Sequence, residues 1–268
     1  MSDINFGSKA LMYEEKGLVQ KATSEILLKL LSISGQEDVL DLGCGPGGVT
    51  QRIAAMTSGQ VVGVDVSPGM IEEALVSGTN FSNLNFMVRD ASQLGFSKQF
   101  DLIYSNSAFQ WFDQPNNALQ ECYNALKPGG RMGIQAPATS LYCPVFIAAV
   151  EKAVRNPVTA PIFESFTSPW FFLESTAEYS TLFEDAGFSV QYSRLIQESN
   201  RFTPEEVFGI FQSGAENGYL NQAYYSLPLS DDYIQTFRKL VKETIHALAD
   251  QQGMVELTFT RVYLVARK

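Results

Sequence analysis

Apolar residues occur along the chain in two patterns, short continuous runs and a helical spacing. Each change from one pattern to the other marks the boundary between a predicted strand and a predicted helix. Short, mostly apolar runs predict buried strands at residues 38–43, 61–65, 83–90, 100–106 and 130–136. Apolar residues at helical spacing predict helices at residues 18–31, 48–56, 68–76 and 115–126. Because the strands alternate with helices, we expect a parallel sheet with helices on both faces.

This alternation breaks after residue 137. Later elements are predicted as helices at 145–154 and 175–187 and as strands at 188–197 and 255–267. Aromatic residues and prolines fill 138–172, and residues 202–250 are irregular and helical. We therefore predict a single domain, residues 1–268, with a core at about 13–137. Two inserted segments, at about 138–172 and 202–250, would form a helical cap.

The composition and charge of the chain argue against a membrane-spanning, a secreted and a nucleic-acid-binding protein. The chain has 268 residues and no apolar stretch of about 20 residues, so no membrane span is expected. The first residues lack the layout of a secretory signal, which predicts a cytoplasmic location. The net charge of -10 disfavours general nucleic-acid binding, because an acidic surface repels phosphates.

The cysteines and the histidine argue against a metal centre. Cys44, Cys122 and Cys143 are widely spaced and odd in number, which matches neither a disulfide framework nor a metal-binding spacing. His246 is the one histidine of the chain, so a His-rich metal site is excluded. We expect no metal.

The stretch VLDLGCGPGGVT, residues 39–50, places glycines between a predicted strand and a predicted helix. Gly43, Gly45 and Gly48 fit the spacing G-x-G-x-x-G, which alone is compatible with a dinucleotide. Glycines at such a turn let a ligand approach the backbone at the carboxyl edge of an open sheet. The sequence therefore predicts a ligand-binding loop here.

Three acids help to decide which ligand the loop holds. Asp41, Asp65 and Asp90 lie at or near the ends of three successive predicted strands. Asp65 can accept hydrogen bonds from ribose hydroxyls, and Asp90 can accept one from an adenine amino group. The set suits a ligand with an amine, a ribose and an adenine, and suits a pyrophosphate poorly, since phosphates need unopposed N–H groups. The alternative is that each acid only caps a loop or a helix.

Five stretches, in this order, resemble the class I S-adenosylmethionine-dependent methyltransferases. They are VLDLGCGPGGVT, VVGVDVSPGMIEEA, RDASQLGF, FDLIYSNSAFQWF and LKPGGRMGI, and the resemblance covers about residues 13–136. It implies a doubly wound, seven-stranded, mostly parallel α/β sheet of the Rossmann-like methyltransferase fold. The strand predicted at 255–267 would be the antiparallel last strand of that sheet.

The resemblance also implies S-adenosyl-L-methionine as the cofactor and gives roles to individual positions. Gly43 and Gly45 would pass close to the methionyl group and ribose, with Asp41 supporting the loop. The other implied cofactor contacts are Asp65 at the ribose, Val66, Met70, Asp90 and Ala91 at the adenine, Asn106 at the methionyl amine, and Tyr13 and Gln20 at its carboxylate.

The stretch SNSAFQWF, residues 105–112, bears on the methyl acceptor. It lacks the Asn/Asp-Pro-Pro-Tyr/Phe signature of enzymes that methylate planar nitrogens. It is similar to the trans-aconitate, malonyl-acyl-carrier-protein and juvenile hormone acid O-methyltransferases, which esterify carboxylates. The resemblance implies O-methylation of a small or carrier-linked carboxylic acid. Trp111 and Phe109 would line the acceptor pocket, or alternatively pack under the following helix.

Aromatic residues in the inserted segments, Tyr142 and Trp170 among them, predict either a lid over a hydrophobic acceptor or a cap with its own core. A carboxylate acceptor also needs a cation, for which the candidates are Arg155, Arg194 and Arg201. Taken singly, each of these arginines is better explained as a solvated surface charge, so the prediction concerns the set and no single member.

Three other functions stay open at this point. C- or N-methylation of a small metabolite would require a base, with Tyr142, Glu164 and Glu174 as candidates. A non-catalytic cofactor-binding regulator is disfavoured by the complete set of motifs. A nicotinamide oxidoreductase is supported by the glycine spacing alone. The oligomeric state and the identity of the acceptor stay open.

Overall fold

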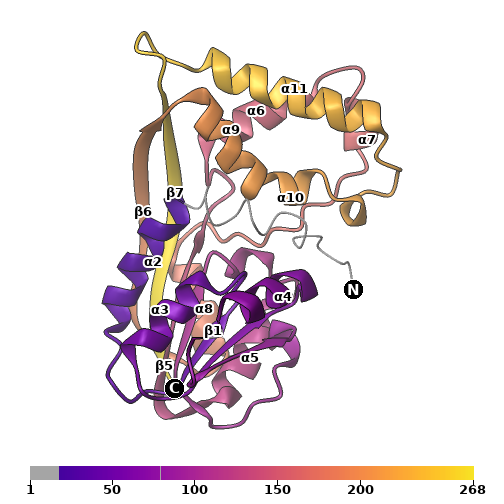
Figure 1. Cartoon of the computed structure of the whole chain (residues 1–268). Helices are drawn as coiled ribbons and strands as arrows, with labels where there is room; N and C mark the ends of the chain where they lie inside the picture. Colours follow the sequence, from indigo (N-terminus) through magenta and orange to yellow (C-terminus); the bar gives the residue numbers. More distant parts are fainter. Residues whose placement is uncertain (1–17, 79) are drawn as a thin grey trace. The chain divides into compact units, whose positions relative to one another are not determined.

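The chain folds around one seven-stranded sheet, described here from a computed structural model for residues 18–78 and 80–268 (Figure 1). The strand order is β3-β2-β1-β4-β5-β7-β6. The strands are β1 (Val39–Leu42), β2 (Val61–Asp65), β3 (Leu84–Val88), β4 (Phe100–Asn106), β5 (Leu126–Pro137), β6 (Ser189–Phe202) and β7 (Val255–Arg267).

The sheet is parallel from β3 to β5, and β7 pairs antiparallel with β5. This confirms the predicted doubly wound, mostly parallel sheet with an antiparallel last strand. Because β1 to β5 run in one direction, the loops that follow them lie at one edge of the sheet, where open α/β folds bind their ligands.

The helices between the strands follow the predicted pattern. They are α2 (Leu18–Leu31), α3 (Gly48–Met56), α4 (Pro68–Ser77), α5 (Pro115–Ala125) and α8 (Thr176–Asp185), with short 3₁₀ turns η2 (Ala91–Gln93) and η3 (Phe109–Trp111). Ser67 caps α4, where its hydroxyl accepts from the backbone N–H of Met70 at 3.4 Å. Pro68 occupies the first turn, where a missing N–H costs no helical hydrogen bond.

One strand boundary differs from the prediction. We expected the fifth strand to begin at Gly130, after a helix at 115–126, but β5 begins at Leu126. Leu126 pairs with Phe100, and the register then shifts so that Arg131 pairs with Leu102. Residues 127–130 therefore belong to the strand and contain its irregularity. The hydrophobic pattern of the sequence gives no signal for a backbone pairing of this kind.

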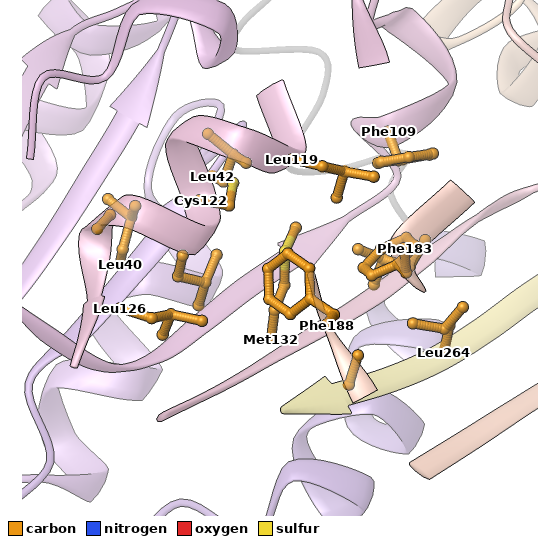
Figure 2. Close-up of a cluster of buried hydrophobic side chains, with 14 of the residues drawn as sticks. Leu40, Leu42, Phe109, Leu119, Cys122, Leu126, Met132, Phe183, Phe188 and Leu264 are labelled. Carbon is orange, nitrogen blue, oxygen red and sulfur yellow. The ribbon is translucent and has the colours of Figure 1, made fainter. Parts of the chain in front are cut away.

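Clusters of buried apolar side chains pack on the sheet, and two of them are large. The larger one joins β1, β4, β5 and β7 with α5 and α8, and Figure 2 shows its members Leu40, Leu42, Phe109, Leu119, Cys122, Leu126, Met132, Phe183, Phe188 and Leu264. The second cluster includes Leu27 and Leu31 of α2 with Leu102 and Tyr104 of β4. A Cβ atom on Gly133 of β5 would lie only 2.7 Å from the Leu31 side chain, so glycine lets α2 pack closely on the sheet.

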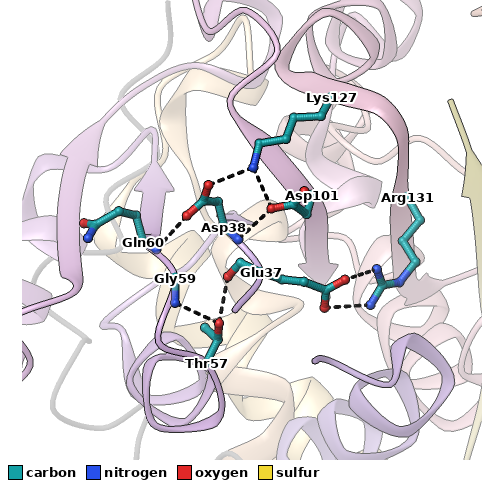
Figure 3. Close-up of polar contacts among 8 residues, drawn as sticks. All are labelled: Glu37, Asp38, Thr57, Gly59, Gln60, Asp101, Lys127 and Arg131. Atoms are coloured by element: carbon teal, nitrogen blue, oxygen red, sulfur yellow. Dashed lines mark hydrogen bonds and ion pairs between the residues drawn. The ribbon is translucent and has the colours of Figure 1, made fainter. Parts of the chain in front are cut away.

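A polar network lies at the amino ends of β1, β4 and β5 (Figure 3). Lys127 Nζ lies 2.8 Å from Asp38 Oδ2 and 2.7 Å from Asp101 Oδ2. Arg131 pairs with Glu37 at 2.5 Å, and its Nη2 donates to the Leu31 carbonyl at 2.7 Å. The network ties three strands and the end of α2 together at the edge opposite the glycine loop.

The chain divides into two compact units. In the described part of the chain, the core unit comprises residues 18–140, Phe171–Ile196 and Arg261–Lys268, and the cap unit comprises Leu141–Trp170 and Gln197–Thr260. Strands β6 and β7 contribute residues to both. The prediction of one domain with inserted segments stays a prediction.

The cap unit is mainly helical. Its helices are α6 (Pro144–Val154), α7 (Ala160–Phe163), α9 (Pro204–Ser213), α10 (Glu216–Tyr219) and α11 (Asp231–Ala247), with a 3₁₀ turn η4 (Gln222–Tyr224). Helix α11 packs against α6 and α9 (Figure 1). No helix in the described ranges is both long and apolar enough to cross a membrane.

Candidate active site

The glycine loop follows β1 at the carboxyl edge of the sheet. Gly43 and Gly45 have φ angles of +77° and +54°, in the left-handed region that favours glycine. The N–H groups of Gly43 and Cys44 donate to the Val64 carbonyl at 2.8 and 3.0 Å, which anchors the loop to β2. A Cβ atom on Gly43 would lie 2.3 Å from the Ala108 Cβ, whereas one on Gly45 would meet nothing within 4 Å. Gly43 is therefore required by packing, and Gly45 leaves room for a ligand.

Asp65 ends β2 and is bonded to this loop. Its Oδ2 accepts from the Gly45 N–H at 2.9 Å, and its Oδ1 accepts from the Ser67 N–H at 2.9 Å. Burial raises the pKa of this carboxyl, and the backbone hydrogen bonds oppose that shift. Each carboxylate oxygen can accept a further hydrogen bond. Asp65 can therefore shape the loop and still accept from two ribose hydroxyls.

Asp41 lies inside β1 and is buried. The Thr50 hydroxyl donates to its Oδ2 at 2.7 Å. Burial raises the pKa of Asp41 to about 7, and the neighbouring charge of Asp65 adds to the shift, while the Thr50 hydrogen bond opposes it. Tyr104 of β4 lies opposite Asp41 in the strand register, and its buried hydroxyl has no hydrogen-bond partner among the described residues.

Asp90 and the two apolar candidates follow β2 and β3. The backbone N–H and the hydroxyl of Ser92 both donate to Asp90 Oδ1 at 2.8 Å, so this acid caps the turn η2, which begins at Ala91. These bonds leave Asp90 Oδ2 for a ligand. Val66 is 51% exposed, and Met70 is buried on α4. An exposed valine next to Asp65 is a suitable surface for an adenine ring.

The loop after β4 carries a compact polar cluster. Ser107 has a φ of +57°, and its N–H donates to the Gln135 carbonyl at 2.7 Å. The Ser107 hydroxyl donates to Gln135 Oε1 at 3.0 Å, and Gln110 Nε2 donates to the Ser107 carbonyl at 2.9 Å. Buried atoms Asn106 Oδ1, Gln110 Oε1 and Gln135 Nε2 have no hydrogen-bond partner in the described part of the chain. Such groups are costly unless a ligand satisfies them.

Of the two aromatic residues predicted to line the acceptor pocket, Phe109 has a different place. It is 0% exposed, and its ring centroid lies 5.2 Å from that of Phe112 and 5.9 Å from that of Phe183. A ring enclosed by other core side chains has no exposed face that an acceptor could contact, so we assign Phe109 to core packing. Trp111 is half-buried at the end of η3 and stays a candidate.

The other two acceptor candidates belong to the cap unit. Tyr142 is buried, and its carbonyl accepts from the Thr260 N–H at 2.8 Å. The Trp170 ring packs edge-on against Tyr219, with the ring centroids 4.7 Å apart. Rings of this unit, including Phe163, Phe166, Phe211, Tyr225 and Phe237, contact one another, as expected of a cap with its own core. Tyr13 and the side chain of Gln20 lie outside the described residues.

The predicted cations are surface groups. Arg155 lies 3.5 Å from Glu151, and its side chain is 79% exposed. Arg201 forms an ion pair with Asp250, and Arg194 lies over the Tyr192 ring.

Sequence reasoning missed a buried arginine of the core unit. Arg261 of β7 is 3% exposed and lies opposite Pro137 in the register of β5. Gln135 lies opposite Tyr263, so Gln135 and Arg261 point to the same face of the sheet, since side chains alternate along a strand. The strand predicted at 255–267 also carries Glu256 and Arg267, so no pattern in the sequence singled out Arg261.

The comparisons with known proteins agree with this geometry. A family model described as "Methyltransferase domain" matches residues 39–130. A methyltransferase of Schizosaccharomyces pombe is 31% identical over 179 residues, which are 65% of this chain and 67% of that protein. This chain belongs to the class I S-adenosylmethionine-dependent methyltransferases.

Two further relatives of this methyltransferase are malonyl-acyl-carrier-protein O-methyltransferases. The one from Hahella chejuensis is 34% identical over 130 residues, 48% of this chain and 46% of that protein. The chain thus spans about half the length of that relative. The one from Acetivibrio thermocellus is 22% identical over 270 residues, 99% of this chain and 92% of that protein.

A solved structure, the YcgJ protein from Bacillus subtilis, matches the methyltransferase with a TM-score of 0.60 and 18% identity. The match covers 92% of this chain and 98% of that one, and it shows the shared fold.

The residues at the carboxyl edge fit S-adenosylmethionine. The methyltransferase offers open space beside Gly45, a carboxylate at Asp65 and an unpaired amide oxygen at Asn106, which suits a positively charged amine. We expect these three residues, with Asp41 and Asp90, to hold the cofactor. In the described ranges, no group of three or more His, Cys, Asp or Glu side chains could hold a metal ion.

Proposed function

We propose that this small-molecule methyltransferase esterifies a carboxylic acid. The supporting observation is Arg261, a buried guanidinium at the carboxyl edge of the sheet, on the same face as Gln135. A guanidinium carries five N–H donors, which can hold a carboxylate alongside other partners. Similarity to two enzymes named as malonyl-acyl-carrier-protein O-methyltransferases supports the same acceptor class.

The reaction requires little acid–base chemistry from the protein. When bound, the cofactor supplies a methyl group to the acceptor oxygen as the carbon–sulfur bond breaks and its electron pair stays on sulfur. A carboxylate is ionised at neutral pH, since its ordinary pKa is about 4. No proton moves, so the residues of the site have only to align the acceptor and exclude water, which contributes on the order of 7–11 kcal/mol.

The three residues considered as bases are poorly suited to that role. Burial raises the pKa of Tyr142 well above its usual range, so its phenol stays protonated. Glu164 is exposed, and Glu174 is exposed and accepts from the Ser140 N–H at 2.7 Å. These observations favour an acceptor that needs no base over a carbon or nitrogen acceptor that does.

The test is to assay carboxylic acids, free and as thioesters on a carrier protein, beside phenols and amines of the same carbon skeleton. We expect methyl transfer to acids alone. Methylation of a phenol, an amine or a carbon acid with acids inert would overturn the proposal and favour the base-dependent alternative.

Arginine variants then locate the charge partner. Arg261→Met is expected to raise the acceptor KM by about 10-fold or more, the scale of a hydrogen bond to a charged group. Arg201→Met and Arg155→Met are surface controls that should leave it unchanged. S-adenosylhomocysteine affinity shows whether Arg261→Met stays folded, and Arg261→Lys should recover part of the acceptor binding. If acids react and Arg261 variants bind them normally, the charge partner lies elsewhere.

A further inference from the structure

We propose that Gln135 positions the methyl acceptor, by donating a hydrogen bond from its side-chain amide to the acceptor oxygen that is not methylated. Ser107 acts through Gln135 by fixing the orientation of that amide. This inference rests on the proposed carboxylate acceptor and names a specificity-determining residue within that site.

The first observation is an unpaired donor in a buried place. Gln135 is 0% exposed, and its Nε2 has no hydrogen-bond partner among the residues that the structure describes. Leaving a buried N–H group unpaired costs its full desolvation free energy, so folded proteins rarely do so without a ligand or water to fill the need. The position lies in β5 beside Ile134 and Ala136, where an apolar residue would pack without that cost.

The second observation is that the amide is held in one orientation. The Ser107 hydroxyl donates to Gln135 Oε1 at 3.0 Å, and the Ser107 N–H donates to the Gln135 carbonyl at 2.7 Å. A bonded carbonyl end leaves the NH₂ end to face a ligand. Ser107 reaches this place with a φ of +57°, a left-handed conformation that is uncommon for a residue other than glycine.

The third observation is the order of groups along the edge of the sheet. From β2 through β1 to β4 the edge presents Asp65, the glycine loop and Asn106, which are the proposed ribose, methionyl and amine contacts. Gln135 on β5 is the next position, in register with Asn106, and Arg261 on β7 comes after it. The acceptor must reach the methyl group on the cofactor's sulfonium. Since Asp65 and the glycine loop, on β2 and β1, are assigned to the cofactor, we infer that the acceptor approaches from the side of β5 and β7.

Two of the three unpaired groups in this cluster, Asn106 Oδ1 and Gln135 Nε2, have opposite characters, which supports different partners. Asn106 Oδ1 is an acceptor and suits the cofactor ammonium, whereas Gln135 Nε2 is a donor and suits an anion. Two anions could use that donor, the acceptor carboxylate and the carboxylate of the cofactor itself. Measurements must therefore separate acceptor binding from cofactor binding.

The experiment compares Gln135→Leu and Gln135→Glu with wild type, using a carboxylic acid that wild type methylates. Gln120→Leu, an exposed glutamine on α5, is the matched control. We expect Gln135→Leu to raise the acceptor KM by about 10- to 100-fold, the scale of one hydrogen bond to a charged group. The dissociation constant of S-adenosylhomocysteine and the melting temperature should stay near wild type.

Gln135→Glu gives a readout that a structural role would not move. A buried carboxylate repels an anionic acceptor, but its protonated form regains a donor, so its acceptor KM should fall between pH 8 and pH 6. Ser107→Ala and Ser107→Gly should raise the acceptor KM less than Gln135→Leu. Glycine relieves the left-handed strain, so an equal effect in both variants identifies the lost hydroxyl as the cause.

The outcomes separate this inference from the proposed function. If wild type methylates no acid, the proposed function fails. If acids react but Gln135→Leu leaves the acceptor KM unchanged, this inference fails while the function stands. If Gln135→Leu weakens S-adenosylhomocysteine and not the acceptor, the amide binds the cofactor, which also overturns the inference.

Discussion

The backbone N–H of Gly45 donates to Asp65 Oδ2 at 2.9 Å, joining two residues that are 20 positions apart. The acid expected to bind the ribose therefore also fixes the glycine loop, which we expect to contact the methionyl part of the cofactor. A change at Asp65 acts on both features at once.

Asp65→Ala is expected to weaken S-adenosylhomocysteine by about 1.5–3 kcal/mol, the range for hydrogen bonds to a charged group. Asp65→Asn keeps one oxygen that can accept a hydrogen bond, so its loss should be smaller. Titration calorimetry on the three proteins measures this directly. Wild-type affinity in Asp65→Ala would contradict the assignment.

Asp41 should make the stability of the fold depend on pH. Its pKa is about 7 when folded, against 3.8 for the ordinary group, because burial disfavours the charged form. The raised folded value means that its contribution is fully present below about pH 4 and is lost as pH rises through 7. Between pH 5 and pH 8 the loss should be about 1–3 kcal/mol.

The matched variant is Asp41→Asn, which cannot ionise and keeps an oxygen for the Thr50 hydroxyl. Urea unfolding at pH 5, 6, 7 and 8 gives the free energy of unfolding for both proteins. The difference between them isolates Asp41 from the other titrating groups. An equal pH dependence in both proteins would show that Asp41 has an ordinary pKa.

Trp111→Ala should lower methyl transfer with little change in S-adenosylhomocysteine affinity. Trp111 ends η3, beyond Asn106 on the chain, and we assign it to the acceptor side. Initial rates at varied acceptor concentration measure methyl transfer, and titration calorimetry measures the affinity for S-adenosylhomocysteine. A similar loss of acceptor and product binding in a folded variant would mean that Trp111 is structural. Phe109→Leu serves as a contrast, because it should lower the melting temperature.

Arg131→Met is expected to reduce stability without affecting either ligand. The residue is largely buried, pairs with Glu37 at 2.5 Å and caps the Leu31 carbonyl of α2. Removing one partner of such a pair leaves a carboxylate unpaired, so the cost should be about 1–3 kcal/mol. Denaturant unfolding measures that cost. If the folded variant bound the cofactor more weakly, the polar network at the amino ends of the strands would not be independent of the cofactor site at their carboxyl ends.

The architecture was largely predictable because its signals are local. Buried parallel strands leave continuous apolar runs, and the glycines and acids at their ends are visible as letters. The start of β5 was not predictable, because the pairing of Phe100 with Leu126 and of Leu102 with Arg131 depends on register. No pattern along one strand reports such a shift in its partner.

The site divides in the same way. Asp41 and Gly45 belong to one quoted stretch and Asp65 to the next, and the three lie together, whereas Gln135 and Arg261 belong to none of these stretches. Their importance depends on which strand lies beside which, and β7 reaches the site from the far end of the chain. For Phe109 the sequence left two alternatives open, the acceptor pocket and core packing, because the rings of Phe171, Tyr179 and Phe183 that contact it lie far along the chain.

The contact between Gly43 and Ala108 limits how this enzyme could be given a new acceptor. A methyl group at position 43 would come within 2.3 Å of the Ala108 Cβ. The loops after β1 and β4 can therefore approach this closely only because residue 43 has no side chain. Neither position can grow without moving Ser107 and the residues around it. Substitutions meant to change the acceptor should therefore be made at Trp111 and the strand ends beyond it, and residues 43 and 108 should be kept.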